Sequence, residues 1–244
     1  MKSALILGAT SDIGKACIEL FAANDYYLYL AGRDYLKLLS VQKDLSTRHN
    51  LKSQLLEIDL TEHQAFSEAI RSIPGNLDVV LCAIGTLGNH PGALENSAEA
   101  LEIIDSNFRS IVPLLQLSAN RLKDQKKGKL IVITSVAGLR GRASNYFYGS
   151  AKAGMIAILS GLRNAMHPYA VQVTTVIPGY VNTRMTAHMN LPTLLTSSPK
   201  HLAKAIYRYT VVGKRNILYW KPIWRYIMLF IRIMPESIFK RINW

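Results

Sequence analysis

Short apolar runs alternate with longer segments whose apolar residues recur at helical spacing along most of this chain. The apolar runs predict strands at residues 2–7, 27–31, 54–58, 77–83, 130–134, 171–177 and 217–220. The segments between them predict helices that include residues 15–23, 36–48, 94–122, 148–166 and 200–212. Continuous apolar strands are typical of a parallel sheet that is covered on both faces. The alternation therefore predicts an α/β fold, a doubly wound parallel sheet of the Rossmann type in a single domain.

Length and composition narrow the class of protein. The chain has 244 residues, 49% of them hydrophobic, which is enough for one large domain; we assign residues 1–220 to it. Cys17 and Cys82 fall in apolar segments and are expected to be small buried side chains in a reducing compartment. The six histidines lack metal-ligand spacing, so no metal site is predicted. No secretory signal and no run of 18 apolar residues is visible, which predicts a chain without a membrane-spanning helix.

A glycine loop follows the first predicted strand and precedes a helix. Its candidate phosphate-binding residues are Gly8, Thr10, Ser11, Asp12, Ile13 and Gly14. A strand, a glycine loop and a helix in this order direct backbone N–H groups and a helix N-terminus at a pyrophosphate. The middle glycine of the G-x-G-x-x-G pattern is absent, so a simple strand-to-helix turn is the competing interpretation.

The end of the second strand bears on the choice of cofactor. Arg33 is the first charged residue there, which suits a 2′-phosphate and favours NADPH over NADH. Asp34 follows, either as a contact for a ribose or as the cap of the next helix. Asp59 is expected to bind an adenine amino group or to mark a helix entry. The remaining candidate cofactor contacts lie at other strand ends: Leu60, Ala83, Gly85, Pro178, Gly179, Val181 and Thr183.

The candidate catalytic residues lie between 128 and 152. Ser135 follows a buried strand directly, and Tyr148 and Lys152 are four residues apart, which places them on one face of a helix. A fixed ammonium lowers the pKa of a phenol, so Tyr148 could exchange a proton with a carbonyl oxygen held by Ser135. A Tyr-x-x-x-Lys pair also occurs by chance on helix surfaces. Tyr146 is a rival for Tyr148, but its partner at i+4 is Ser150.

Asn107 lies within the long helix predicted over 94–122. A buried asparagine there is costly unless its amide is used, whereas an exposed one is unremarkable.

These motifs together resemble the short-chain dehydrogenase/reductase family over residues 1–220. The resemblance implies that Tyr148 is the general acid, Lys152 lowers its pKa and binds the nicotinamide ribose, and Ser135 polarises the carbonyl. It also implies that Asn107 holds a relay water, and that Pro178, Gly179 and Thr183 contact the cofactor. Two departures are visible: Cys82-Ala83-Ile84-Gly85 replaces Asn-Asn-Ala-Gly, and Leu7 stands where Thr is usual. Residues 185–212 are expected to cover the substrate.

The last residues, 221–244, form a basic and apolar tail. From residue 213 onward the chain has seven Lys and Arg residues and one acid, Glu236, out of a formal net charge of +13. On a helix, Lys221, Arg225, Arg232 and Glu236 would share one stripe, with apolar residues elsewhere. This amphipathic pattern predicts a helix lying in a membrane interface. Packing on its own domain or on a second subunit is the alternative.

The tail suggests a substrate class and a set of partners. The chain is similar to keto-reductase subunits that act on polyprenyl-phosphate-linked sugars, which implies a lipid-linked ketone and a partner oxidase. We expect a cytoplasmic protein peripheral at the inner face of the membrane, and a homo-oligomer by family resemblance. Nucleic acid is not an expected partner, because bulky aliphatic residues interrupt the basic ones. A reductase of a soluble ketone and a non-catalytic nucleotide-binding membrane protein are the alternatives.

Overall fold

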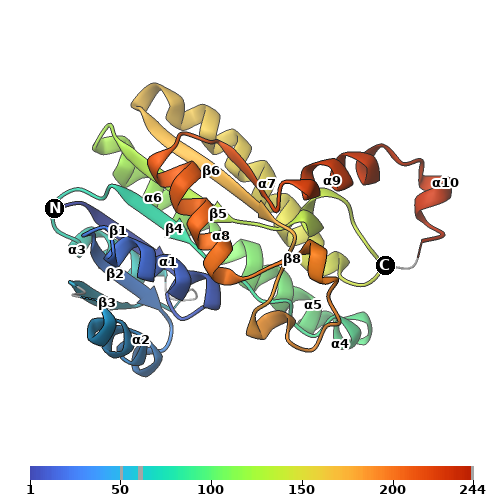
Figure 1. The fold of residues 1–244 in the computed structure, drawn as a ribbon, viewed down its shortest axis with the longest axis horizontal. Helices are drawn as coiled ribbons and strands as arrows, with labels where there is room; N and C mark the ends of the chain where they lie inside the picture. Colours follow the sequence, from blue (N-terminus) through green and yellow to red (C-terminus); the bar gives the residue numbers. More distant parts are fainter. Residues whose placement is uncertain (50–51, 60–62, 243–244) are drawn as a thin grey trace.

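Seven parallel strands form the central sheet of the protein (Figure 1). The structure is a computed structural model, which describes residues 1–49, 52–59 and 63–242. Across the sheet the order is β3 (Ser53–Glu57), β2 (Tyr27–Gly32), β1 (Ser3–Leu7), β4 (Val79–Cys82), β5 (Gly128–Ile133), β6 (Val171–Pro178) and β9 (Ile217–Trp220). The order reverses between β1 and β4, as in a doubly wound sheet. The predicted fold class is confirmed.

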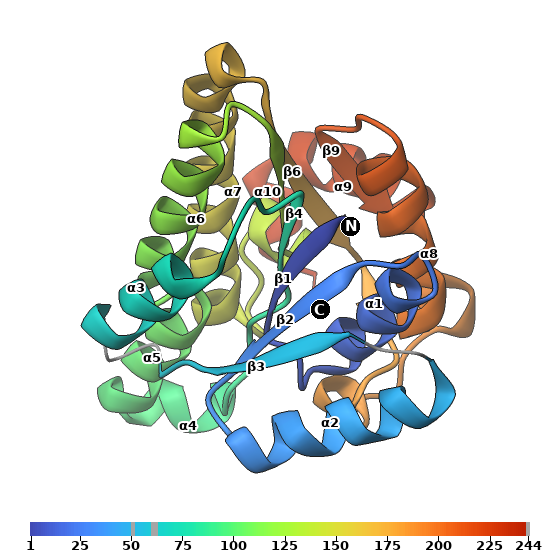
Figure 2. The same cartoon turned by 90° about the vertical axis from the view of Figure 1, so that its left-hand side faces the viewer.

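Helices cover both faces of the sheet (Figure 2). One face packs against α1 (Asp12–Ala22), α2 (Tyr35–Arg48) and α8 (Pro199–Ile206). The other packs against α3 (His63–Ser72), α6 (Val112–Asp124) and α7 (Tyr146–Met166). Alternate residues of β1 serve the two cores, since Ala4 and Ile6 point to the first and Leu5 and Leu7 to the second. This alternation explains why the inner strands are mostly apolar and have no polar face.

The single long helix predicted over 94–122 is wrong. The structure has α4 (His90–Glu95), α5 (Ser97–Ile104), a π-helical segment over 105–109, and then α6. Asn96 ends α4 and caps α5 by accepting a hydrogen bond from the Ala98 N–H. Pro113, which lacks an N–H, lies in the first turn of α6. Similarly, the helix predicted over 200–212 is α-helical only to Ile206 and π-helical from Tyr207.

The helix of the tail, α9 (Ile223–Ile233), packs one face on its own domain. Trp224, Met228 and Ile231 are buried there together with Val136 and Ile177. The indole of Trp224 lies so close to Gly179 that a Cβ at that position would overlap it. For this face of the tail, the alternative that it packs on its own domain is therefore correct.

The predicted stripe of Lys221, Arg225, Arg232 and Glu236 on one helix is also corrected. Helix α9 ends at Ile233, Met234 is extended, and Pro235 precedes a short helix α10 (Glu236–Phe239). Glu236 therefore belongs to α10. There it pairs with Arg140 at 2.8 Å, and the same guanidinium donates to the carbonyls of Ile231 and Met234.

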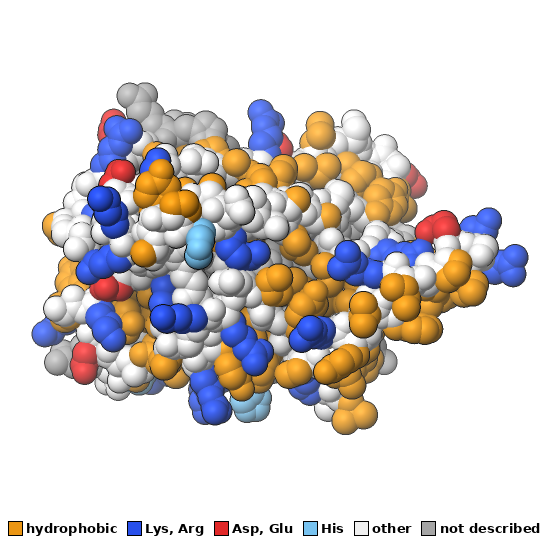
Figure 3. Space-filling model, turned by 90° about the horizontal axis from the view of Figure 1, so that it is seen from above, with side chains coloured by type: hydrophobic (Ala, Val, Ile, Leu, Met, Phe, Trp, Pro, Cys, Tyr) orange, Lys and Arg blue, Asp and Glu red, His pale blue; other side chains and the backbone are white. Residues whose placement is uncertain are grey.

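A second face of α9 remains exposed and apolar. Its residues are between 50% and 71% exposed: Ile223, Tyr226, Leu229, Phe230 and Ile233. Hydrophobic side chains gather around the tail at the right of Figure 3, with Lys and Arg among them. Within the described residues, every helix is too short or too polar to cross a bilayer.

Candidate active site

A cavity of about 920 Å³ opens at the carboxyl ends of the strands. The loops that follow β1, β2, β4, β5 and β6 all contribute to its wall. In an open parallel sheet, ligands bind in this position, outside the strand ends where the strand order reverses. The cavity therefore brings together most of the residues that the sequence singled out.

The glycine loop forms a cradle that side chains could not occupy. Gly8 has φ +83°, and a Cβ on it would lie 2.8 Å from the Ala83 carbonyl oxygen. Ser11 caps α1: its hydroxyl donates to the Gly8 carbonyl at 2.8 Å and accepts from the Gly14 N–H at 3.0 Å. Thr10, Ser11, Asp12 and Ile13 line the cavity, and the start of α1 faces it. This cradle fits a pyrophosphate.

Gly14, predicted as a cofactor contact, lies behind this lining. A Cβ there would overlap the Gly8 carbonyl oxygen, so the residue lets α1 approach the loop closely.

Arg33 and Asp59 line the cavity just after the ends of β2 and β3. Asp34 instead caps α2, where its carboxylate accepts from the Lys37 N–H at 2.9 Å and pairs with the Lys37 ammonium at 2.8 Å. Its predicted capping role is therefore confirmed. The structure describes no hydrogen bond or ion pair of the Arg33 side chain among residues 1–49, 52–59 and 63–242. Leu60, another predicted contact, lies outside the described residues.

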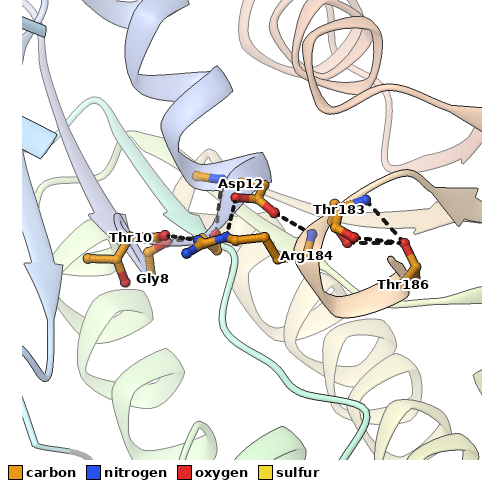
Figure 4. A network of polar contacts seen from close by, with 8 residues as sticks. Gly8, Thr10, Asp12, Thr183, Arg184 and Thr186 are labelled. Carbon is orange, nitrogen blue, oxygen red and sulfur yellow. Dashed lines mark hydrogen bonds and ion pairs between the residues drawn. The ribbon is translucent and has the colours of Figure 1, made fainter. Parts of the chain in front are cut away.

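An ion pair connects the glycine loop with the loop that follows β6 (Figure 4). Arg184 Nε lies 2.8 Å from Asp12 Oδ1, and the Arg184 backbone N–H donates to Asp12 Oδ2 at 2.7 Å. The guanidinium also donates to the Thr10 carbonyl at 2.8 Å. Beside it, Thr183 and Thr186 are hydrogen-bonded to each other. The loop that carries the predicted contacts Pro178, Gly179, Val181 and Thr183 is thereby joined to the phosphate cradle.

Ser135, Tyr148 and Lys152 meet in the wall of the cavity. Ser135 follows β5 and begins a short 3-10 helix, where its hydroxyl accepts from the Ala137 N–H at 3.1 Å. Tyr148 and Lys152 lie one turn apart near the start of α7, and the ammonium is 5.6 Å from the centre of the phenol ring. The Lys152 ammonium also donates to the Ile84 carbonyl at 3.4 Å. The predicted trio is thus arranged around one point.

Burial dominates the acid–base properties of this trio. It raises the pKa of Tyr148 to about 12, while a hydrogen bond from Ser135 and the charge of Arg142 act to lower it. Burial also lowers the pKa of Lys152 from 10.5 to about 8. That Lys152 lowers the pKa of Tyr148 stays a prediction.

Asn107 is fully buried in the π-helical segment, so the surface alternative is wrong. Its amide nitrogen donates to the carbonyls of Thr86 at 2.7 Å and Ile103 at 2.9 Å, and its oxygen accepts from the Thr86 N–H at 3.1 Å. It supports the cavity wall from behind. A Cβ on Gly85 would lie 2.8 Å from Asn107 Oδ1 and 2.9 Å from the Lys152 ammonium, which explains the glycine there.

Two arginines of the cavity wall were missed as site residues: Arg142 and Arg184. A signal existed for each. Arg142 lies in the connection between the predicted catalytic residues Ser135 and Tyr148, and Arg184 directly follows the predicted contact Thr183. The described residues contain no cluster of three or more metal-binding side chains.

The buried charge of Lys152 predicts a dependence of stability on pH. Because its pKa is lowered from 10.5 to about 8 on folding, the unfolded chain binds the proton more tightly, and stability rises with pH between these values. Between pH 7 and pH 9.5 we expect the free energy of unfolding to rise by about 2 kcal/mol relative to a Lys152→Met variant. Urea denaturation at both pH values measures this difference. Parallel pH profiles for the two proteins would contradict it.

The sequence of this chain matches a known enzyme family and proteins named as oxidoreductases. The family profile described as "short chain dehydrogenase" matches residues 2–193. An uncharacterized oxidoreductase of Mycobacterium tuberculosis is 32% identical over 242 residues, which cover 97% of this chain and 95% of that protein. An uncharacterized oxidoreductase of Streptomyces coelicolor is 29% identical, with 99% and 96% covered.

Solved structures share the fold. A short-chain dehydrogenase from Sphingobium yanoikuyae in complex with NADPH superposes with a TM-score of 0.81 at 19% identity, over 97% of this chain and 98% of that one. A bulky-bulky ketone specific alcohol dehydrogenase from Comamonas testosteroni gives 0.77 at 19% identity, over 97% and 96%.

Proposed function

The chain belongs to the short-chain dehydrogenase family, and from this premise we propose that it is an NADPH-dependent carbonyl reductase acting on a lipid-linked sugar or another ketone at a membrane surface. The convergence of Ser135, Tyr148 and Lys152 on the cavity that also contains the glycine cradle carries the proposal. In this role Ser135 holds the carbonyl oxygen by a hydrogen bond, and Tyr148 gives it a proton. When bound, NADPH supplies the hydride.

Several residues of the chain would hold the cofactor. The cradle around Gly8 fits the pyrophosphate, and Asp59, which also lines the cavity, would bind the adenine amino group. Lys152 and Thr183 also line this cavity, where Lys152 would bind the nicotinamide ribose and Thr183 the nicotinamide end. Asn107 would support this part of the cavity wall through its hydrogen bonds to the backbone of Thr86.

Arg33 supports the choice of NADPH over NADH. Its side chain lines the cavity where a 2′-phosphate would lie, and the neighbouring carboxylate of Asp34 is engaged by Lys37. We expect Arg33→Gln to raise the Kd for NADPH by roughly 10- to 100-fold while the Kd for NADH stays unchanged. Isothermal titration calorimetry measures both, with Lys43→Gln, an exposed cation on the same helix α2, as the matched control. If Arg33→Gln raised the Kd for NADPH and for NADH equally, Arg33 would not be the residue that recognises the 2′-phosphate.

The exposed face of α9 supports the membrane assignment. Apolar side chains there are flanked by the exposed cations Arg225 and Arg232. We expect the double variant Leu229→Ser and Phe230→Ser to lower binding to vesicles with anionic lipids by more than about tenfold, since each side chain contributes about 1.5–3 kcal/mol when buried. Flotation measures the loss, and Leu36→Ser, exposed on α2, is the control.

The same double variant tests the alternative for the tail. Unchanged flotation together with dissociation of an oligomer, seen by analytical ultracentrifugation, would assign this face to a subunit interface and favour a soluble ketone as substrate.

The substrate class is tested by following NADPH oxidation with the full chain in vesicles. We expect turnover of a keto-sugar linked to a polyprenyl phosphate, and the partner oxidase implied by this reaction would supply that ketone. Binding of NADPH with no turnover over a panel of keto-lipids and soluble ketones would overturn the reductase assignment in favour of a non-catalytic nucleotide-binding protein.

A further inference from the structure

A second, smaller cavity lies between the loop before α7 and the tail. Its volume is about 300 Å³, and its walls come from residues 141–146 on one side and residues 236–242 on the other. Arg142 lines both this cavity and the large one. The smaller cavity therefore lies next to the catalytic cavity, on the side of the tail.

Positive side chains outnumber negative ones in the wall of the smaller cavity. Glu236 is in its wall, but Arg140 neutralises this carboxylate by an ion pair of 2.8 Å. The cations Arg142 and Lys240 also line it, and neither side chain has an ion pair within the described residues. The smaller cavity therefore has a surplus of positive charge, which attracts an anion.

Apolar surface adjoins these cations. Tyr146, Phe239 and Ile242 complete the wall of the smaller cavity. Phe239 is held in place because the Arg140 guanidinium lies 3.8 Å from the centre of its ring. A ligand with an anionic group and an apolar chain matches this combination better than a free anion does.

Arg142 also acts on the reacting groups. Its charge reaches the phenol of Tyr148, where it lowers the pKa against the effect of burial. An anion on Arg142 would consequently lie close to the carbonyl that Tyr148 protonates.

We propose that Arg142 and Lys240 form a subsite for the phosphate that connects the substrate's keto-sugar to its lipid. The inference rests on the proposed function. The sugar occupies the large cavity beside Tyr148, the phosphate lies on Arg142, and the lipid leaves along the apolar wall formed by the tail. Arg142 is thereby a specificity-determining residue, since its guanidinium binds a phosphate in a bidentate manner.

Direct binding tests this subsite without turnover. The full chain is saturated with NADP⁺, so that the cofactor's own phosphates are already bound, and is titrated with farnesyl phosphate, farnesol or inorganic phosphate in a calorimeter. We expect farnesyl phosphate to bind most tightly. Arg142→Gln should weaken its binding by roughly 10- to 100-fold and Lys240→Gln by less, in keeping with hydrogen bonds to charged groups. Arg142→Lys should retain part of the affinity.

The controls separate the outcomes. Arg71→Gln, an exposed cation in the last turn of α3, should leave the affinity unchanged, and the thermal midpoint of each variant reports on folding. Equal binding of farnesol and farnesyl phosphate, or an unchanged Arg142→Gln variant, would overturn the subsite. Equal binding of inorganic phosphate and farnesyl phosphate would overturn its assignment to a lipid-linked substrate. If the protein binds farnesyl phosphate as expected but reduces no ketone, the reductase assignment is wrong and the phosphate subsite stands.

Discussion

Replacing Tyr148 by Phe should lower the turnover number by about 10²- to 10⁴-fold, the usual contribution of a general acid. The substitution removes only the hydroxyl, which lies against Ser135 in the cavity wall. The glycine cradle and Arg33 are untouched, so the Kd for NADPH should stay within about twofold of the wild-type value. Steady-state kinetics and calorimetry measure the two quantities.

Tyr146→Phe is the matched control for this experiment. Tyr146 begins the same helix two residues earlier, and its side chain is 42% exposed. Its ring contacts His90 and Phe147, which the substitution preserves. We expect nearly wild-type turnover. If Tyr148→Phe also retained turnover, the role assigned to Tyr148 would be wrong.

Trp224→Ala should lower the free energy of unfolding by about 3–5 kcal/mol, the usual cost of removing a large buried aromatic side chain. The indole is 3% exposed, donates to the Leu195 carbonyl at 3.1 Å and packs edge-on against Tyr180. Urea denaturation measures the change. Because Tyr180 lines the large cavity, the KM for the ketone should also rise.

Tyr226→Ala tests whether this loss is specific to the buried face. Tyr226 lies on the same helix but is 68% exposed, so we expect a change within about 0.5 kcal/mol. Similar losses for both variants would mean that helix propensity, and not packing on Gly179, accounts for the effect.

The sequence predicted those parts of the fold and site that depend on local patterns. Apolar runs identified the seven strands, because the five inner strands, β1, β2, β4, β5 and β6, each contribute buried side chains to the cores on both faces. Ser135, Tyr148 and Lys152 could be identified because a strand end and a helical spacing of four residues determine their relative positions. The glycine cradle was found because its pattern lies within a few consecutive residues, although the contact that requires Gly8 comes from Ala83, which follows β4.

Features that depend on contacts between distant segments could not be predicted in this way. Helical periodicity continues through residues 94–122, and the breaks come from side chains such as Asn96 and from Pro113. The tail was assigned to a membrane from its composition. Yet the buried face of α9 packs against Val136 and Ile177, which lie far earlier in the sequence. Arg142 and Arg184 acquire their positions in the same non-local way.

The position of β9 at the edge of the sheet has a consequence for biosynthesis. Among the strands that the structure describes, β9 pairs with β6 alone, and the tail that follows covers Ile177 at the end of β6. While the nascent chain is still attached to the ribosome, the earlier strands can assemble, but β6 presents an unpaired edge and an uncovered apolar end. Chains arrested before Ile217 should therefore depend on chaperones and aggregate without them, whereas emergence of β9 from the ribosome completes the sheet.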